Sequence, residues 1–227
     1  MSKRGKKYKK IAEKKQHKVY DLKEAISQVK NFSYCSFPAT IELHVALKLT
    51  KDLEPKSIKG AVSLPHSESK EVKIAVFTTP ADEKKAKEAG ADLVGTEDIT
   101  KQVKEGKINF DVAIATPEVM PQIAQLGKEL GPKGLMPNPK TGTVTNDIEN
   151  TVKEYKKGKT NFAADNQGVI HIAVGKQELE DEKIQENIKE ALQTIASTLG
   201  NKEINQIVRK MHLAPTMGPS VQFKLSE

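Results

Sequence analysis

The sequence predicts a protein of two domains that combines the α/β and α+β classes. Apolar and polar residues alternate near both ends of the chain, which is typical of half-buried strands. The middle instead alternates short apolar runs with helical patterns, which is typical of parallel sheets. Each end segment, at about 65 residues, is too short to bury a convincing core alone. We therefore predict a discontinuous α+β domain at 1–67 and 159–227, with an inserted Rossmann-like parallel-sheet α/β domain at 68–158.

The first end segment begins with a helix and continues with strands. Asp21 and Glu24 have the spacing of a capping box, and apolar residues follow at helical intervals, so we expect a helix at 21–31. Every second residue from 41 to 49 is apolar, which predicts a strand with one buried face and one polar face free for contact. A second strand is expected at 60–64, before Pro65.

The middle segment is predicted to form a small parallel sheet. We expect strands at 72–79, 93–94 and 112–116, and helices at 80–89, 98–105, 117–130 and 147–157. This order implies parallel strands joined by helical crossovers. Because no Gly-x-Gly-x-x-Gly turn accompanies the sheet, the fold by itself indicates no cofactor, and we expect none.

The second end segment returns to the pattern of the first. We expect a strand at 169–174, an amphipathic helix at 181–198 and a last strand at 221–225. The chain would cross between the domains near 65–70 and near 156–161. Both crossings are polar, which suits a hinge of two segments.

Composition indicates a globular protein and excludes several classes. Hydrophobic residues make up 37% of the 227 residues and charged residues 30%. No apolar run approaches the roughly 18 residues of a membrane span, and no apolar segment follows the start MSKRGKKYKK, so we expect no membrane segment and no secretory signal. With the single Cys35 an internal disulfide is excluded, and we expect a cytoplasmic protein.

Positive charge is concentrated at the beginning of the chain. The net charge is +7, and residues 1–18 carry nine Lys or Arg against Glu13 alone. Such a basic arm attracts polyanions by releasing their counterions, although a solvated and partly disordered tail has the same composition. The lysines of the arm that could contact a polyanion include Lys6, Lys7, Lys9 and Lys10.

Catalysis and metal binding have little support in the sequence. The histidines show no metal-ligand spacing with one another or with Cys35; they are His17, His44, His66, His171 and His212. We therefore expect no metal site, no catalytic residue and no enzymatic activity.

The stretch GPKGLMPNPKTGTV at 131–144 is the most unusual in the chain. Its prolines and glycines exclude a helix or a central strand and predict a stiff irregular loop. From Gly134 to Thr141 it has the spacing of a Walker A loop, but Pro139 replaces the second glycine and has no N–H for a phosphate. A rival hypothesis, a nucleotide-binding or enzymatic protein built on the inserted domain, would place a phosphate on Lys133, Lys140 and Thr141.

Polar residues at two predicted strand starts suggest an RNA-binding surface. We call this set the RNA platform: Phe37, Thr40, Glu42, Thr216, Met217, Gly218 and Ser220. If the two strands are neighbours, hydroxyl and backbone groups there could contact ribose hydroxyls and phosphates, and Gly218 would permit close approach. The alternative, a simple turn before a strand at 216–220, is the more common use of such residues.

The stretch at 131–144 resembles the signature of the bacterial ribosomal protein L-one family, the large-subunit protein of the mobile stalk beside the tRNA exit site. Further matches occur in the family's order along the chain: GAVSLPH at 60–66, AGAD at 89–92, ATPEVM at 115–120 and TMGPS at 216–220. Together they are spread along nearly the whole chain, so the resemblance is specific.

The resemblance implies a structural RNA-binding protein of the large subunit. It would bind the stalk rRNA through the RNA platform, assist release of deacylated tRNA from the exit site, and repress translation of its own mRNA. Secondary RNA contacts are expected at Lys133 and Lys140 and along the basic arm. The implied partners are large-subunit rRNA, own-operon mRNA, exit-site tRNA and the ribosome, with no membrane partner and a monomer when free.

Overall fold

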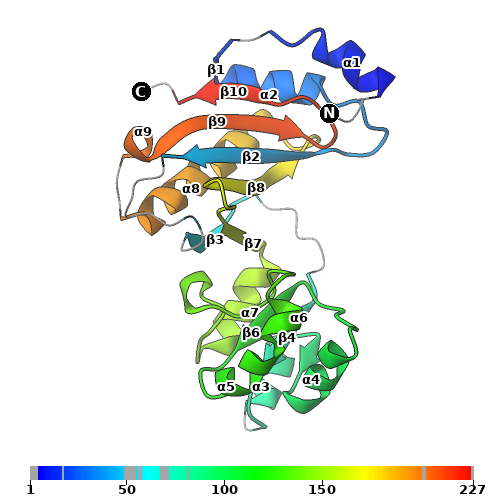
Figure 1. Cartoon of the computed structure of the whole chain (residues 1–227), viewed down its shortest axis with the longest axis vertical. Helices are drawn as coiled ribbons and strands as arrows, with labels where there is room; N and C mark the ends of the chain where they lie inside the picture. Colours follow the sequence, from blue (N-terminus) through cyan, green and yellow to red (C-terminus); the bar gives the residue numbers. More distant parts are fainter. Residues whose placement is uncertain are drawn as a thin grey trace. The chain divides into compact units, whose positions relative to one another are not determined.

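The chain divides into two compact units, each described here by itself (Figure 1). The structure, a computed structural model, describes residues 5–16, 18–48, 55, 58–66, 72–80, 82–200 and 203–225. The first unit comprises Met1–Glu68 and Phe162–Glu227, and the second comprises Ser69–Asn161. The mixed α/β and α+β fold class is confirmed, whereas independent folding and function of the two units remain predictions.

A five-stranded sheet forms the centre of the first unit. Its strand order is β1-β10-β9-β2-β8. β1 pairs with β10 in parallel, and the other pairs are antiparallel. The strands are β1 (Tyr20–Asp21), β10 (Val221–Lys224), β9 (Val208–Pro215), β2 (Thr40–Leu47) and β8 (Val169–Lys176). A separate two-stranded sheet joins β3 (Lys59–Ser63) to β7 (Lys159–Ala163).

Helices cover one face of the five-stranded sheet. α2 (Leu22–Asn31) contacts β9 and β10, and α8 (Asp181–Thr198) contacts β8, so both lie on the same side (Figure 1). The predicted alternation in β2 is confirmed, because Ile41, Leu43 and Val45 are fully buried toward these helices. The expected strand end at Leu49 lies outside the described residues. The opposite face of the sheet carries the polar positions and stays free of α2 and α8.

A buried asparagine of α8 fixes the chain beyond β3. Asn187 is fully buried. Its Nδ2 donates to the backbone oxygens of His66 at 3.0 Å and Val174 at 2.8 Å, and its Oδ1 accepts from the His66 backbone N–H at 3.0 Å. Two bonds thus hold His66 to α8, and the third ties α8 to β8.

Several expectations for the first unit need correction. Asp21 is the N-cap of α2, but its side chain makes no capping hydrogen bond, and Glu24 instead lies 3.7 Å from the Lys18 Nζ. Three elements were not predicted: β9, β7 and the helix α1 (Lys6–Ala12). The short α9 (Ile204–Ile207) also went unpredicted. β9 matters most, because it is the strand that organises the RNA platform.

The second unit contains a three-stranded parallel sheet of order β5-β4-β6, as predicted. The strands are β5 (Leu93–Val94), β4 (Ile74–Phe77) and β6 (Val112–Ala115). Two apolar clusters flank them. One includes residues of α4 (Glu97–Lys104), and the other includes residues of α3 (Glu83–Glu88) and α7 (Ile148–Lys156). Helices therefore pack on both sheet faces, as in a Rossmann-like fold.

The helix expected at 117–130 is wrong as a single element. The chain instead forms three short segments, α5 (Met120–Ile123), the 3₁₀ turn η2 (Ala124–Leu126) and α6 (Gly127–Leu130). Pro121, in the first turn of α5, has no N–H, and Gly127 weakens a continuous helix. The apolar positions Ile123, Leu126 and Leu130 are nevertheless buried, so the helical periodicity predicted the packed face correctly.

Within the described part of the chain, no helix is long and apolar enough to cross a membrane.

Candidate nucleic-acid interface

The strand β9 brings the two halves of the RNA platform together. The sequence places residues 216–220 before a predicted strand, and the platform was predicted on the condition that this strand neighbours β2. That strand, β10, is not a neighbour of β2, because β9 lies between them. Residues 216–220 are the turn from β9 to β10, and Pro215 at the end of β9 pairs with Ile41 at the start of β2. The platform therefore forms by a different pairing from the one anticipated.

Thr216 and Thr40 are joined by backbone and side-chain hydrogen bonds. The Thr216 N–H donates to the Thr40 backbone oxygen at 2.9 Å, and the Thr40 N–H donates to the Thr216 Oγ1 at 3.0 Å. The same hydroxyl lies 3.2 Å from the Thr40 backbone oxygen, to which it can donate. The Thr216 side chain thus completes the sheet where the backbone ladder ends.

The segment before β2 holds the turn from its other side. The Tyr34 hydroxyl donates to the Met217 backbone oxygen at 2.8 Å, and the Cys35 Sγ lies 3.5 Å from the Thr216 backbone oxygen. The Gly218 N–H donates to the Pro215 oxygen at 3.0 Å and closes the turn. The peptide groups of the turn are therefore fixed before any ligand arrives.

Met217 has a conformation that is unusual for its residue type. Among the described residues it is the one non-glycine residue with a positive φ, at 66°. Its side chain is 67% exposed, and that of Phe37 is 53% exposed. Exposed apolar side chains on fixed segments provide surfaces for unstacked bases, with Phe37 offering an aromatic ring. Backbone strain at an exposed residue of this kind is found at ligand-binding sites.

Gly218 is required by the packing of the turn. A Cβ atom there would lie 2.4 Å from the Pro215 Cγ and 3.0 Å from the Phe32 backbone oxygen. The sequence suggested that glycine at position 218 permits close approach of a ligand. Packing within the protein itself gives a second reason for a glycine at this position. Any side chain at position 218 would displace the turn that presents Met217.

The remaining platform residues are less closely tied to the turn. Glu42 lies two residues beyond Thr40 on the same face of β2 and is half-buried. Its Oε2 is 3.8 Å from the His44 Nε2. Ser220 is half-buried immediately before β10. The structure thus joins Thr40, Thr216, Met217 and Gly218 through one bonded network, with Phe37, Glu42 and Ser220 adjacent to it in the chain.

The loop at 131–144 is rigid for reasons internal to the second unit. The Thr141 and Thr143 hydroxyls are 2.9 Å apart, and both lie within 3.1 Å of the Asn138 backbone oxygen. Thr141 is buried, and the helix α7 begins only at Ile148. A Walker A arrangement needs a free hydroxyl and an immediate helix, so this loop cannot form one. Lys133 and Lys140 are exposed.

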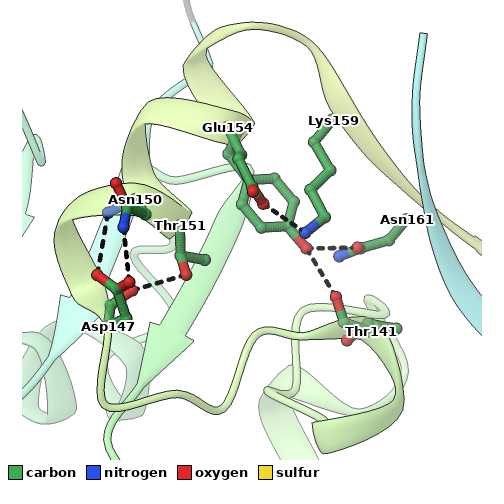
Figure 2. Close-up of polar contacts among 8 residues, drawn as sticks. Thr141, Asp147, Asn150, Thr151, Glu154, Lys159 and Asn161 are labelled. Atoms are coloured by element: carbon green, nitrogen blue, oxygen red, sulfur yellow. Dashed lines mark hydrogen bonds and ion pairs between the residues drawn. The ribbon is translucent and has the colours of Figure 1, made fainter.

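A buried tyrosine connects this loop to the strand that leaves the second unit. The Tyr155 hydroxyl is 3.2 Å from the Thr141 backbone oxygen and 2.7 Å from the Asn161 Oδ1. Above the same ring, the Lys159 Nζ is 2.7 Å from the Glu154 Oε2 (Figure 2). Asp147 caps α7 by accepting from the Asn150 N–H at 3.3 Å. The loop is therefore held by contacts that need no ligand.

The second unit should lose stability at alkaline pH through Tyr155. Burial raises the pKa of Tyr155 to about 12, above the value near 10 of an unfolded tyrosine. The neutral phenol therefore stabilises the folded state fully below pH 10, and this contribution of about 2 to 3 kcal/mol is lost as the pH rises from 10 toward 12. Urea unfolding between pH 8 and 11.5 measures it. Tyr155→Phe should show a shallower decline over that range, and an equal decline would contradict the assignment.

Part of the basic arm is helical. α1 (Lys6–Ala12) has Ile11 packed against the core of the first unit. The candidate contacts are exposed on this helix: Lys6, Lys7, Lys9 and Lys10. Residues 1–4 and His17 lie outside the described residues. The disordered-tail interpretation is therefore wrong for 6–12, where the charges are carried on an anchored helix.

The described residues contain no cluster of three or more His, Cys, Asp or Glu side chains that could hold a metal ion. Sequence reasoning did miss a feature of another kind. His44 stands opposite both His171 and His212 in the sheet, and only the strand register reveals this row.

Comparisons with known proteins identify one class of protein along nearly the whole chain. A model of the Ribosomal protein L1p/L10e family matches residues 9–219. The chain is 44% identical over 207 residues to the large ribosomal subunit protein uL1 of Thermosipho africanus, covering 91% of this chain and 89% of that one. It is 39% identical over 226 residues to the protein of that name from Prochlorococcus marinus strain MIT 9312, covering 100% and 96%. The same-named protein of Colwellia psychrerythraea is 41% identical over 204 residues, covering 90% and 88%.

These matches define a structural, non-enzymatic protein of the large ribosomal subunit. The chain belongs to the ribosomal protein L1p/L10e family. Its partners include the ribosome and ribosomal RNA, and it is associated with cytoplasmic ribosomes. The family resemblance found in the sequence motifs is confirmed, and the enzymatic rival hypothesis is wrong.

Proposed function

We propose that the chain anchors on the rRNA of the large-subunit stalk through the RNA platform of its first unit. The bonded pair Thr40–Thr216 carries this proposal, because it brings together segments 176 residues apart and fixes an exposed surface between them. That surface offers the apolar side chains of Phe37 and Met217 beside hydroxyl and carboxylate groups, which suits unstacked bases and ribose hydroxyls. Direct contacts to the turn backbone would add shape recognition.

The first unit should bind the stalk rRNA fragment without the second. Replacing residues 70–158 by a short glycine linker leaves the platform and its core intact, so we expect an affinity within about threefold of the full chain, equivalent to less than 1 kcal/mol. Filter binding at fixed salt measures this, and circular dichroism shows whether the shortened chain folds. Loss of binding by a folded shortened chain would move the site to the second unit.

A basic scaffold that binds only through α1 is the competing explanation. It requires that removal of the lysines at 6, 7, 9 and 10 abolishes binding and that changes in the platform have no effect. On our proposal, four alanines at these positions reduce the dependence of affinity on salt but leave specific binding. A salt titration of both proteins distinguishes the two, because each lost phosphate contact lowers the slope by about one.

We further propose that the protein assists release of deacylated tRNA from the exit site and represses translation of its own mRNA. Exposed Lys133 and Lys140 on the rigid loop of the second unit suit a secondary contact with RNA or tRNA. Repression would use the same platform if the mRNA contains a mimic of the rRNA site. We expect the free protein to be a monomer. Competition between the rRNA fragment and the mRNA leader for this protein tests whether both RNAs bind the platform.

A further inference from the structure

A row of three histidines crosses the open face of the five-stranded sheet. His44 of β2 is opposite His171 of β8 on one side and His212 of β9 on the other. Its neighbours Leu43 and Val45 are buried on the opposite face, where α2 and α8 pack (Figure 1). The imidazole rings of His44 and His171 pack edge to face, with their centroids 4.9 Å apart. Three proton-binding side chains therefore lie together on the face that leads to the RNA platform.

The histidine row borders the platform at Glu42, which has small residues on either side. Glu42 stands between Ala173 and Ala214 in the neighbouring strands, and Thr40 with Thr216 follows beyond it. Four residues of strand separate His44 from Thr40, or about 13 Å. The residues beside Glu42 on both neighbouring strands are thus small. An RNA backbone that leaves the Thr40–Thr216 pair along β2 would therefore meet the histidines.

The hydrogen bond between His44 and His171 limits the number of protons that the histidine row can bind in the free protein. The Nδ1 atoms of His44 and His171 are 2.7 Å apart, so one of them donates and the other must remain unprotonated. Their outer nitrogens each face a carboxylate at 3.8 Å, Glu42 for His44 and Asp165 for His171. The pair can accept one proton while this bond persists, and a second would break it.

Cations surround the third histidine. Lys15, from the segment after α1, and Lys210 on β9 both act electrostatically on His212. Burial is the largest cause that lowers the pKa of His212, followed by these two lysines. Burial also lowers the pKa of His44, followed by His171, while Glu42 opposes the shift. Burial therefore disfavours the protonated form of both imidazoles in the free protein.

We propose that His171, His44 and His212 form a second RNA contact that takes up protons when phosphates approach. This proposal rests on the proposed function and extends the RNA-binding surface along the open face of the sheet. Phosphates would supply the negative charge that the row lacks, favour the imidazolium forms and accept their hydrogen bonds. RNA binding then strengthens as the pH falls, because each bound proton adds a positive charge to the face that meets the phosphates.

The test compares binding of the stalk rRNA fragment by the full chain at pH 8 and pH 6. For the natural sequence we expect affinity to rise about tenfold, as one histidine whose pKa increases on binding would produce. Calorimetry in buffers of different ionisation heat should show proton uptake at pH 6.5. His44→Gln/His171→Gln/His212→Gln should remove both effects, and the exposed His171→Gln alone should reduce them, which keeps the test valid if the triple variant fails to fold.

His66→Gln is the matched control. His66 pairs with Glu186 of α8 at 2.5 Å, and it stands outside the row, so its loss should leave the pH dependence unchanged. A natural chain whose affinity is equal at both pH values, or a folded triple variant that keeps the rise, would overturn the inference while leaving the platform intact. No binding by the natural chain at either pH would overturn the proposed function, and this inference with it.

Discussion

Met217→Asp should lower affinity for the stalk rRNA fragment by about a hundredfold or more, equivalent to roughly 3 kcal/mol. The change removes an exposed apolar side chain from the centre of the RNA platform and places a negative charge where RNA would lie. The fold should tolerate it, because the positive φ of 66° at this position suits aspartate better than methionine. Filter binding or calorimetry at constant salt measures the loss.

Met217→Asn separates the effect of charge from the effect of shape. Asparagine has nearly the same size as aspartate and tolerates the same backbone conformation. It should lose only the apolar contact, so its affinity should lie between those of the natural chain and of Met217→Asp. If the aspartate variant binds as tightly as the natural chain, residues 216–220 are merely a turn and the platform is elsewhere.

Asn187→Ala should lower the free energy of unfolding of the first unit by about 3 kcal/mol. The substitution removes three hydrogen bonds, a buried one to the oxygen of Val174 and two partly buried ones to the N–H and oxygen of His66. Each such group costs about 1 to 3 kcal/mol when water cannot replace the bond, and partial relaxation reduces the sum. Urea unfolding followed by circular dichroism measures the loss.

Gln193→Ala, at an exposed position of the same helix, is the control for helix propensity. It should change stability by no more than about 0.5 kcal/mol, since alanine favours the helix and no buried bond is lost. An Asn187→Ala variant as stable as this control would show that solvent reaches His66, and that α8 does not fix the chain beyond β3.

Local patterns predicted the elements whose packing follows directly from periodicity. The helix at 181–198 matches α8 at both ends, because its apolar stripe and acidic first turn are strong signals. β9 escaped prediction because Arg209 and Lys210 interrupt its start and only Met211, Leu213 and Pro215 mark its buried face. Its place between β2 and β10 is a long-range pairing that no local window contains.

The candidate site was predictable as a set of residues and not as an arrangement. The motif at 216–220 indicated the turn, and the alternation in β2 indicated the polar face that carries Thr40 and Glu42. Only the structure shows that the Thr216 hydroxyl bonds to Thr40, and that Gly218 is needed because Pro215 fills the space beside it. The histidine row likewise depends on the register of three strands, which the separate histidines in the sequence do not reveal.

The long separation of Thr40 from Thr216 along the sequence has a consequence for protein synthesis. Thr40 must wait for a partner that is translated 176 residues later. At about 5 to 20 residues per second, that interval is roughly 10 to 35 s. During it, β2 lacks its β9 edge, and the turn that carries Met217 has not been made. A nascent chain therefore cannot form the Thr40–Thr216 pair before Thr216 has been translated.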